Sequence, residues 1–331
     1  MAVQDRGNFS EIPMLDVSGL YSDDPAKIAD VAKTLRGHLE NIGFLYVTGH
    51  GVPPESIDAV RAAAKLFHAQ PDEEKQKLKI DKNFRGYLGF NTSTIVTSSV
   101  AKVSKPNQSE SLMIMNEVAA DDADALAGKP LQGPNQWPDE SNLPGFRDTI
   151  ETYVKQMTDL ARRLVSAIAT SLGMPADGLD GYFEKPTTFL RLLHYPTQPA
   201  EEGLFGSAPH TDYGFITLLA QDDVGGLEVK NKAEEWVPAP PVANAFVMNV
   251  GDILARWSND LFVSTPHRVI NRSGRERYSQ PFFFDPSMES SIETLPATVP
   301  AGSQPKYQPV IYGEYLMERI DKNYHYRKKA S

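Results

Sequence analysis

Short strand-like segments separated by turn residues occupy the C-terminal part of this chain, and they restrict its possible folds more than any other feature. Runs of β-branched and aromatic residues follow Thr188 and are interrupted by Gly, Pro, Asn and Asp. The predicted strands span residues 188–195, 214–221, 226–230, 245–250, 264–271 and 276–284. Many short strands with this punctuation are typical of a sandwich or barrel of the jelly-roll type.

Helical periodicity is found mainly outside this region. Apolar residues recur at helical spacing in residues 24–39, 53–67 and 146–173, and residues 312–323 are typical of a closing helix. Two further strands are predicted at residues 12–17 and 43–47. The long amphipathic helix from Phe146 needs a sheet to pack against, so we expect it to back the strands. The predicted fold class is mainly β with flanking helices (α+β), preceded by an N-terminal α/β region.

Two stretches without clear periodicity divide the chain. Residues 81–116 are rich in Ser, Thr and Asn, and residues 117–145 are acidic and punctuated by Pro and Gly, which predicts a loop. We therefore expect an N-terminal region over residues 1–116, a linker over 117–145, and a C-terminal part over 146–331. At 331 residues the chain can bury a substantial core, and we expect these parts to form one compact unit.

Composition excludes several functional classes. The net charge is −10, and the only basic cluster is Arg327-Lys-Lys329, so nucleic acid and anionic membranes are poor candidate partners. The absence of cysteine excludes a disulfide framework, a thiol nucleophile and an iron–sulfur cluster. No signal peptide and no run of eighteen apolar residues is visible, so a soluble cytoplasmic protein is expected.

Two histidines and one aspartate form the most informative motif. His210 and Asp212 lie two residues apart, and His267 follows fifty-seven residues after His210. Residues two apart in a strand face the same side, so His210 and Asp212 could hold one ion. Two imidazoles and a carboxylate are the ligand set of mononuclear non-haem Fe(II), with positions left open for substrates. Taken singly, His267 could be a core histidine and Asp212 could cap a turn.

An arginine and a serine follow this motif. Arg277 and Ser279 share strand parity, and a guanidinium binds a carboxylate through two parallel hydrogen bonds. A surface ion pair is the alternative, because Arg272, Arg275 and Glu276 lie in the preceding polar turn. Only Arg277 is followed by strand sequence. A metal clamp followed by an anion clamp suits an acidic co-substrate held against iron.

The sequence around these residues resembles the isopenicillin N synthase-like family of 2-oxoglutarate/Fe(II) dioxygenases. The resemblance extends over residues 11–320, and it is carried by residues 209–219, 249–259, 264–269 and 277–284, with the shorter matches 12–13, 43–46 and 49–52. It implies a double-stranded β-helix (jelly-roll) core preceded by a non-haem dioxygenase N-terminal region. It also implies Fe(II) as cofactor, 2-oxoglutarate and O₂ as co-substrates, and ascorbate as a candidate activator. The implied reaction is oxidation, usually hydroxylation, of an unactivated C–H bond, with release of succinate and CO₂.

The resemblance assigns roles to individual residues. Arg277 and Ser279 match the pair that binds the distal carboxylate of 2-oxoglutarate, and Tyr195 matches a tyrosine that contacts the same carboxylate. Leu193 departs from the asparagine that many plant members carry, so one co-substrate contact is missing or comes from elsewhere. No catalytic residue is expected beyond the metal ligands.

Three residues are candidates for substrate binding. Arg191 shares strand parity with Tyr195, and a buried arginine needs an acceptor, which is either a substrate or a structural acid. Tyr213 and Phe283 are candidates for the pocket wall, although aromatic residues in such strands are often plain core. The expected partner is a small organic molecule whose identity, like the oligomeric state, is left open.

Two rival functions remain at this point. Some relatives of the same fold are oxidases that do not use 2-oxoglutarate and place the Arg-x-Ser pair on a different anion. A jelly-roll protein that binds without catalysis is the second rival.

Overall fold

The computed structural model describes the chain except residues 1–6, 97–99, 101–102, 198–202, 325–326 and 328–331. Its largest element is a mixed sheet of eight strands, in the spatial order β1-β2-β10-β7-β12-β5-β4-β3. The strands of this sheet are β1 (Met14–Asp16), β2 (Phe44–Thr48), β3 (Gly86–Leu88), β4 (Glu110–Met115), β5 (Thr187–Tyr195), β7 (Ile216–Gln221), β10 (Phe246–Val250) and β12 (Arg277–Asp285). Only β1 and β2 pair in parallel; the other pairs are antiparallel.

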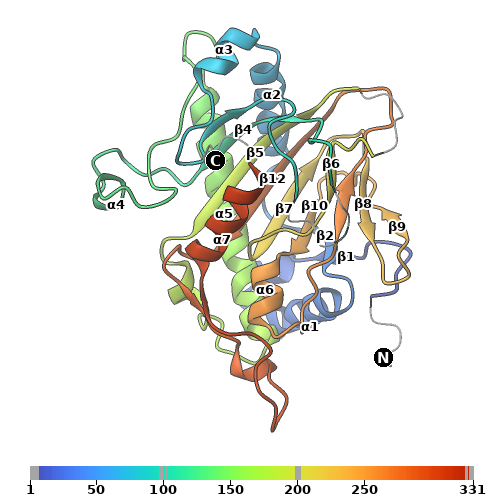
Figure 1. Cartoon of the computed structure of the whole chain (residues 1–331). Helices are drawn as coiled ribbons and strands as arrows, with labels where there is room; N and C mark the ends of the chain where they lie inside the picture. The colour runs from blue at the N-terminus through green and yellow to red at the C-terminus, as the bar shows by residue number, and fades with distance from the viewer. Residues whose placement is uncertain (1–6, 97–99, 101–102, 198–202, 325–326, 328–331) are drawn as a thin grey trace.

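A second sheet closes one side of the barrel. Its strands are β6 (Ser207–His210), β8 (Leu227–Lys230), β9 (Trp236–Pro238) and β11 (His267–Val269), in the order β6-β11-β8-β9. Together the two sheets form the predicted jelly-roll core (Figure 1). A small two-stranded sheet, β13 (Ser291–Ile292) and β14 (Val310–Ile311), leads into the last helix.

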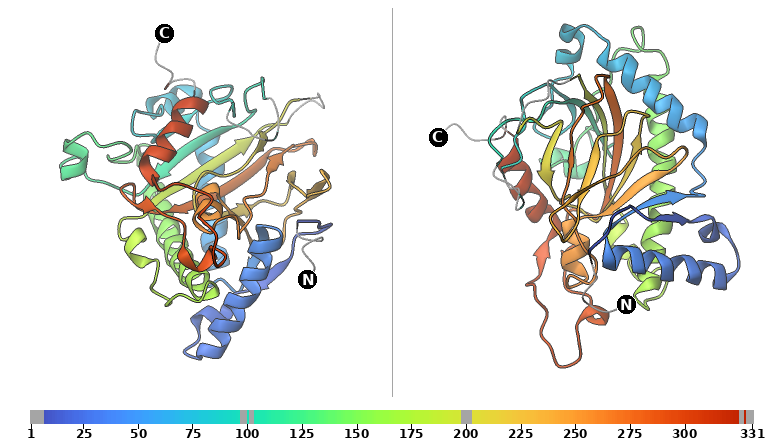
Figure 2. Two further views of the ribbon diagram at one scale, coloured as in Figure 1. Left: turned by 60° about the horizontal axis from the view of Figure 1, so that its bottom comes forward. Right: turned by 90° about the vertical axis from the view of Figure 1, so that its right-hand side faces the viewer.

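Helices flank the main sheet on both sides (Figure 2). They are α1 (Pro25–Asn41), α2 (Pro54–His68), α3 (Asp72–Lys77), α4 (Ala123–Leu126), α5 (Phe146–Ser171), α6 (Asp252–Trp257) and α7 (Tyr312–Asn323). Short 3₁₀ turns occur at Ser18–Tyr21, Asp180–Phe183 and Pro296–Thr298. Figure 2 shows α2 and α5 along one side of the main sheet and α7 on the other side. The long predicted helix is therefore confirmed as a backing helix.

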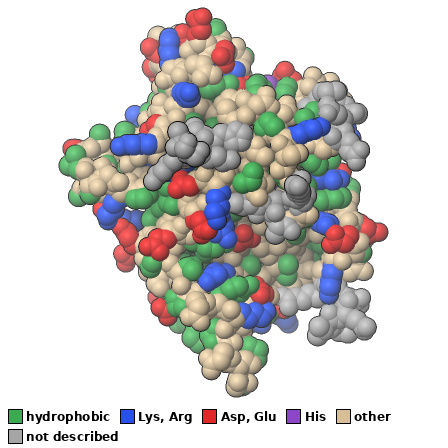
Figure 3. Space-filling view, viewed as in Figure 1, with side chains coloured by type: hydrophobic (Ala, Val, Ile, Leu, Met, Phe, Trp, Pro, Cys, Tyr) green, Lys and Arg blue, Asp and Glu red, His purple; other side chains and the backbone are tan. Residues whose placement is uncertain are grey.

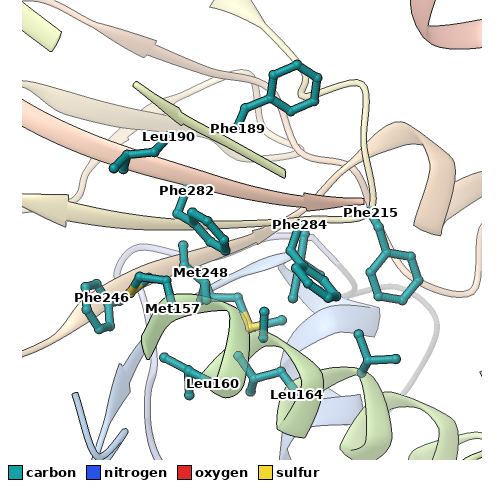
Figure 4. Packing of buried hydrophobic residues seen from close by; sticks show 14 of the residues in the cluster. Met157, Leu160, Leu164, Phe189, Leu190, Phe215, Phe246, Met248, Phe282 and Phe284 are labelled. Atoms are coloured by element: carbon teal, nitrogen blue, oxygen red, sulfur yellow. The ribbon is translucent and has the colours of Figure 1, made fainter. Parts of the chain in front are cut away.

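The alternation of side chains along the strands separates two cores. Phe282 and Phe284 of β12 point toward Leu160 and Leu164 of α5, whereas Phe189 of β5 points away from that helix (Figure 4). The odd-numbered residues of β5 and β12 face the barrel interior instead. Burial of the apolar side chains between α5 and the sheet, at about 25 cal/mol per Å², holds the helix against the sheet.

Most predicted elements are confirmed within a few residues, but several strands and helices of the structure were not predicted. Residues 110–115, within the stretch that lacked clear periodicity, form β4, a fully buried strand of the main sheet. Helix α6 and strand β6 were also absent from the prediction. The predicted strand at 264–271 is shorter than expected and spans only His267–Val269.

The surface agrees with an acidic, mixed-charge protein. Acidic and basic side chains are interspersed over the face seen in Figure 3. Among the described residues, no helix is both long enough and apolar enough to cross a membrane.

Candidate metal centre and co-substrate site

Three side chains converge at the edge of the second sheet. His210 is the last residue of β6, and it pairs across the sheet with His267, the first residue of β11. The Oδ1 atom of Asp212 lies 3.7 Å from the Nε2 atoms of both His210 and His267. One ligand atom from each residue lies within 4.8 Å of the others. The structure thus brings the three predicted ligands together.

The strand-parity argument for this pair was wrong in its premise. Strand β6 ends at His210, so Asp212 lies in the turn that follows. The turn itself returns the carboxylate to the imidazole. Its tight course requires glycine, because a Cβ at Gly214 would lie 1.9 Å from Asp285 Oδ1, and a Cβ at Gly251 would lie 2.1 Å from the Gly214 carbonyl oxygen.

In the triad, His210 Nδ1 and Asp212 Oδ2 face away from the centre and already form hydrogen bonds within the protein. The Nδ1–H of His210 donates to the Ala208 carbonyl over 2.7 Å, which leaves Nε2 as a free lone pair. The Oδ2 atom of Asp212 accepts hydrogen bonds from Thr217 Oγ1 over 2.5 Å and from Asn249 Nδ2 over 2.7 Å. Such outer contacts orient metal ligands before the metal arrives. The donor set therefore fits a divalent cation of the Fe(II) type.

Protonation states in the triad also suit a metal. Burial, and then the neighbouring His267, lower the pKa of His210 to about 4, so its imidazole is neutral at pH 7. Burial raises the pKa of Asp212, but the two histidines and its two hydrogen bonds outweigh that, so the pKa of Asp212 lies below its usual value. A neutral imidazole and an ionised carboxylate are the forms that bind metals.

A buried arginine lies further along the inner face of the main sheet. Arg277 is 0% exposed, and its guanidinium stacks on the ring of Tyr195, with 4.7 Å from Cζ to the ring centroid. It donates to Ser279 Oγ over 3.2 Å and to Gln221 Oε1 over 3.4 Å, while its Nε has no hydrogen-bond partner. The structure thus places Arg277, Ser279 and Tyr195 in one cluster.

No counter-charge for the Arg277 guanidinium is found in the part of the chain that the structure describes. Among the described residues, no carboxylate lies within 4 Å of it, which contrasts with the exposed Arg275 and its 3.0 Å ion pair with Asp223. A buried, permanently charged group is costly unless an anion pairs with it. Gln221, which accepts from Arg277, and Thr217, which donates to Asp212, lie four residues apart on β7 and therefore on the same face of the sheet.

A cavity opens beside His210 and Asp212, and Arg277 is not among the residues that line it. Its wall contains all three predicted substrate residues, Arg191, Tyr213 and Phe283. Arg191 donates to Ser111 Oγ over 3.0 Å, and its Nε has no partner. The remaining wall is largely apolar, and it includes Phe84, Met113, Phe189, Leu316, Ile320 and Tyr324. Helix α7 therefore covers one side of the cavity.

Several functional residues escaped the sequence prediction. Thr217 and Asn249 face each other across β7 and β10, and both hold Asp212. Gln221 was also missed as a neighbour of Arg277. The available signal was polar residues in otherwise apolar strands, Thr217 and Gln221 in β7 and Asn249 in β10.

Comparisons with known proteins agree with this geometry. A model of the 2OG-Fe(II) oxygenase superfamily matches residues 186–286, and a model of the N-terminal part of the non-haem dioxygenase in morphine synthesis matches residues 12–140. The chain is 38% identical over 321 residues to the 2-oxoglutarate-Fe(II) type oxidoreductase hxnY of Emericella nidulans, covering 94% of this chain and 90% of the relative.

Further relatives cover nearly whole chains. Homoarginine-6-hydroxylase 2-ODD-C23 of Glycine max is 36% identical over 337 residues, covering 96% of this chain and 98% of the relative. The crystal structure of a full-length Neurospora crassa protein in complex with alpha-KG and thymine superposes with a TM-score of 0.84 at 30% identity, covering 95% of this chain and 98% of that one.

Proposed function

Because the chain belongs to the 2OG-Fe(II) oxygenase superfamily, we propose that His210, Asp212 and His267 hold Fe(II), and that Arg277 and Ser279 hold the distal carboxylate of 2-oxoglutarate. The chain is a 2-oxoglutarate- and Fe(II)-dependent oxygenase of a small molecule. The observation that supports the residue assignment best is the unpaired, buried Arg277 on the same inner face as a preorganised triad.

The protein orients the groups that bind metal and co-substrate and shields them from water. When bound, Fe(II) with 2-oxoglutarate and O₂ provides the oxidising power that hydroxylates a C–H bond and leaves succinate and CO₂. Thr217 and Asn249 fix the Asp212 carboxylate with Oδ1 toward the metal position. Tyr195 lies against the Arg277 guanidinium and keeps water from it. No side chain needs to act as a general base.

For the prime substrate, we propose a planar, conjugated small molecule that presents a carbonyl or carboxylate to Arg191. The unpartnered Nε of Arg191 needs an acceptor, and the charge of Arg191 is close enough to the triad to lower the pKa of His210. Phe189 and Phe283 are in edge-to-face contact beside it and offer flat walls.

A cationic substrate fits this cavity less well. Its described carboxylates are Asp212, which faces the metal position, and Asp285. Burial raises the pKa of Asp285 to about 7, and its oxygens already accept hydrogen bonds from the Phe215 amide and the Tyr312 hydroxyl. A guanidinium group would therefore find no free anion on the described wall.

The assignment is tested by anaerobic reconstitution with Fe(II) followed by addition of 2-oxoglutarate. A visible charge-transfer band is expected, because a 2-oxo acid chelated to Fe(II) absorbs there. Succinate release should then be measured with thymine, 5-formyluracil and homoarginine as probes. We expect greater stimulation by the two pyrimidines than by homoarginine, and the reverse order would contradict the proposed substrate class.

Replacing Arg191 with methionine should impair use of the prime substrate alone. The loss of a charge-assisted hydrogen bond costs about 1.5–3 kcal/mol, which corresponds to roughly a 10- to 100-fold fall in kcat/KM. The Kd of 2-oxoglutarate, measured from the charge-transfer band, should stay within twofold of the wild-type value. The control is Arg163→Met, which removes an exposed arginine on α5, away from the cavity. A normal kcat/KM in Arg191→Met would show that Arg191 is structural.

A further inference from the structure

A second group of two histidines and a carboxylate lies on the outer face of the main sheet. Glu110 of β4 is 2% exposed, and side chains from four other elements converge on its carboxylate. Its Oε1 accepts from His194 Nδ1 over 2.7 Å and faces His68 Nδ1 at 3.4 Å. Its Oε2 accepts from Lys75 Nζ over 2.9 Å and also from the Tyr87 hydroxyl. We name these five residues the Glu110 cluster.

The geometry of this cluster differs from that of the metal centre. In the triad, the histidine nitrogens stand 3.7 Å from the carboxylate oxygen, with an ion-sized gap between them. In the Glu110 cluster, the 2.7 Å separation from His194 is the length of a hydrogen bond. Lys75 already neutralises the carboxylate, so a divalent ion would leave excess positive charge buried. The cluster is therefore a hydrogen-bonded ion pair.

The contacts also fix the protonation pattern. His68 donates its Nε2–H to the Leu192 carbonyl over 2.8 Å, and burial lowers the pKa of His68, so this ring is neutral. Burial alone would raise the pKa of Glu110, but the hydrogen bonds from His194 and Lys75 outweigh burial and hold it well below the usual value. The carboxylate thus stays ionised and keeps His194 oriented.

The Glu110 cluster lies directly behind the co-substrate site. In the register of β5 and β12, His194 pairs with Tyr278, between the inward pairs Tyr195–Arg277 and Leu193–Ser279. The His194 and Tyr278 rings stack on the outer face, with centroids 4.7 Å apart and planes at 16°. Tyr278 is thus the residue between Arg277 and Ser279, and its ring rests on a histidine that Glu110 holds.

We infer that Glu110 is a positioning residue for 2-oxoglutarate, acting through His194 and Tyr278 on the strand that presents Arg277 and Ser279. The inference rests on the proposed role of those two residues. Glu110 fixes the imidazole, the imidazole fixes the tyrosine ring, and the ring fixes the backbone on both sides of Tyr278. Glu110 itself touches neither co-substrate nor metal.

The test measures the Kd of 2-oxoglutarate, from the charge-transfer band of the Fe(II)-loaded protein, in Glu110→Gln, Tyr278→Leu and the double variant. Each single variant should raise this Kd about 10-fold and leave Fe(II) affinity unchanged. The double variant should bind no more weakly than Tyr278→Leu alone, because both changes act through one contact. Tyr278→Leu leaves the buried ion pair intact, so it remains informative if Glu110→Gln does not fold.

Leu35→Ala on α1 is the control for a general loss of stability. Leu35 is 0% exposed and lies outside β5 and β12, so its truncation should lower the Tm without changing the Kd of 2-oxoglutarate. An unchanged Kd in both single variants, while Arg277→Ala loses binding, would overturn the inference and leave the proposed function standing. If Arg277→Ala binds normally, the proposed function itself fails. One equivalent of Ni²⁺ retained in Asp212→Ala and lost with Glu110→Gln would make the cluster a metal site.

Discussion

Replacing Asp212 with alanine should abolish turnover and Fe(II) binding at micromolar metal. Asp212 supplies the only carboxylate oxygen that faces both histidines among the described residues, and its other oxygen is occupied by Thr217 and Asn249. Two neutral imidazoles alone carry no charge to offset a divalent ion. The measurement is bound iron per chain after anaerobic loading and desalting, together with succinate formation.

Graded variants around the same carboxylate should separate charge from orientation. Thr217→Val and Asn249→Leu each remove one hydrogen bond to Oδ2 and keep the ligand. Loss of such a contact typically costs roughly 10- to 100-fold in metal affinity or activity, so both variants should fall between the wild type and Asp212→Ala. Asp223→Ala removes an exposed acid outside the site and should behave as the wild type. Full activity of Asp212→Ala in metal-defined buffer would remove Asp212 from the triad.

The sequence predicted the proximity of the three candidate ligands for a reason that was partly mistaken. Two-residue spacing was read as strand parity, yet β6 ends at His210 and a glycine-dependent turn brings Asp212 back. The spacing nevertheless selected residues that lie together, because a turn stabilised by residues 249–253 also returns the Asp212 carboxylate to His210. The backbone contacts involved, from Asp252 to Asp212 and from Gly251 to Phe215, join segments about forty residues apart. Local pattern carries no information on such contacts.

The strands that were predicted and the missed strand β4 differ in how apolar their sequences are. Strands β5 and β12 are long and apolar with turn residues on both sides, and their bounds were predicted within one residue. Strand β4 begins with Glu110 and Ser111, so its start reads as polar although all six of its residues are buried. A buried glutamate is tolerable only because side chains from four other elements pair with it. That condition is tertiary and cannot be seen in one segment.

The co-substrate assignment depended on choosing among clustered arginines. Arg275 and Arg277 lie two residues apart, and the choice of Arg277 rested on the strand sequence that follows it. Their environments differ: Arg277 is buried with no described carboxylate within 4 Å, and Arg275 is exposed and paired with Asp223. Burial together with the lack of a partner could not be read from sequence, and this combination is what points to a ligand.

Replacing Arg277 with alanine should raise the KM for 2-oxoglutarate by roughly 100- to 5,000-fold and change kcat at saturation far less. Breaking a buried ion pair costs about 3–5 kcal/mol, and each 1.36 kcal/mol corresponds to a factor of ten. Arg277→Lys keeps the charge but not the two-pronged geometry, so an intermediate rise is expected. The readout is initial succinate formation over a range of 2-oxoglutarate concentrations, with iron saturating.

Arg275→Ala is the matched control, because it removes an arginine from the same strand end at an exposed position. Its KM for 2-oxoglutarate should equal that of the wild type. Without co-substrate, no described carboxylate offsets the buried charge of Arg277, so Arg277→Ala should unfold at the same temperature as the wild type or higher. Only the wild type and Arg275→Ala should gain stability from 2-oxoglutarate, by about 2.7 kcal/mol at 100 times the Kd. If Arg277→Ala instead unfolds at a lower temperature than the wild type and also binds 2-oxoglutarate more weakly, Arg277 is a structural residue.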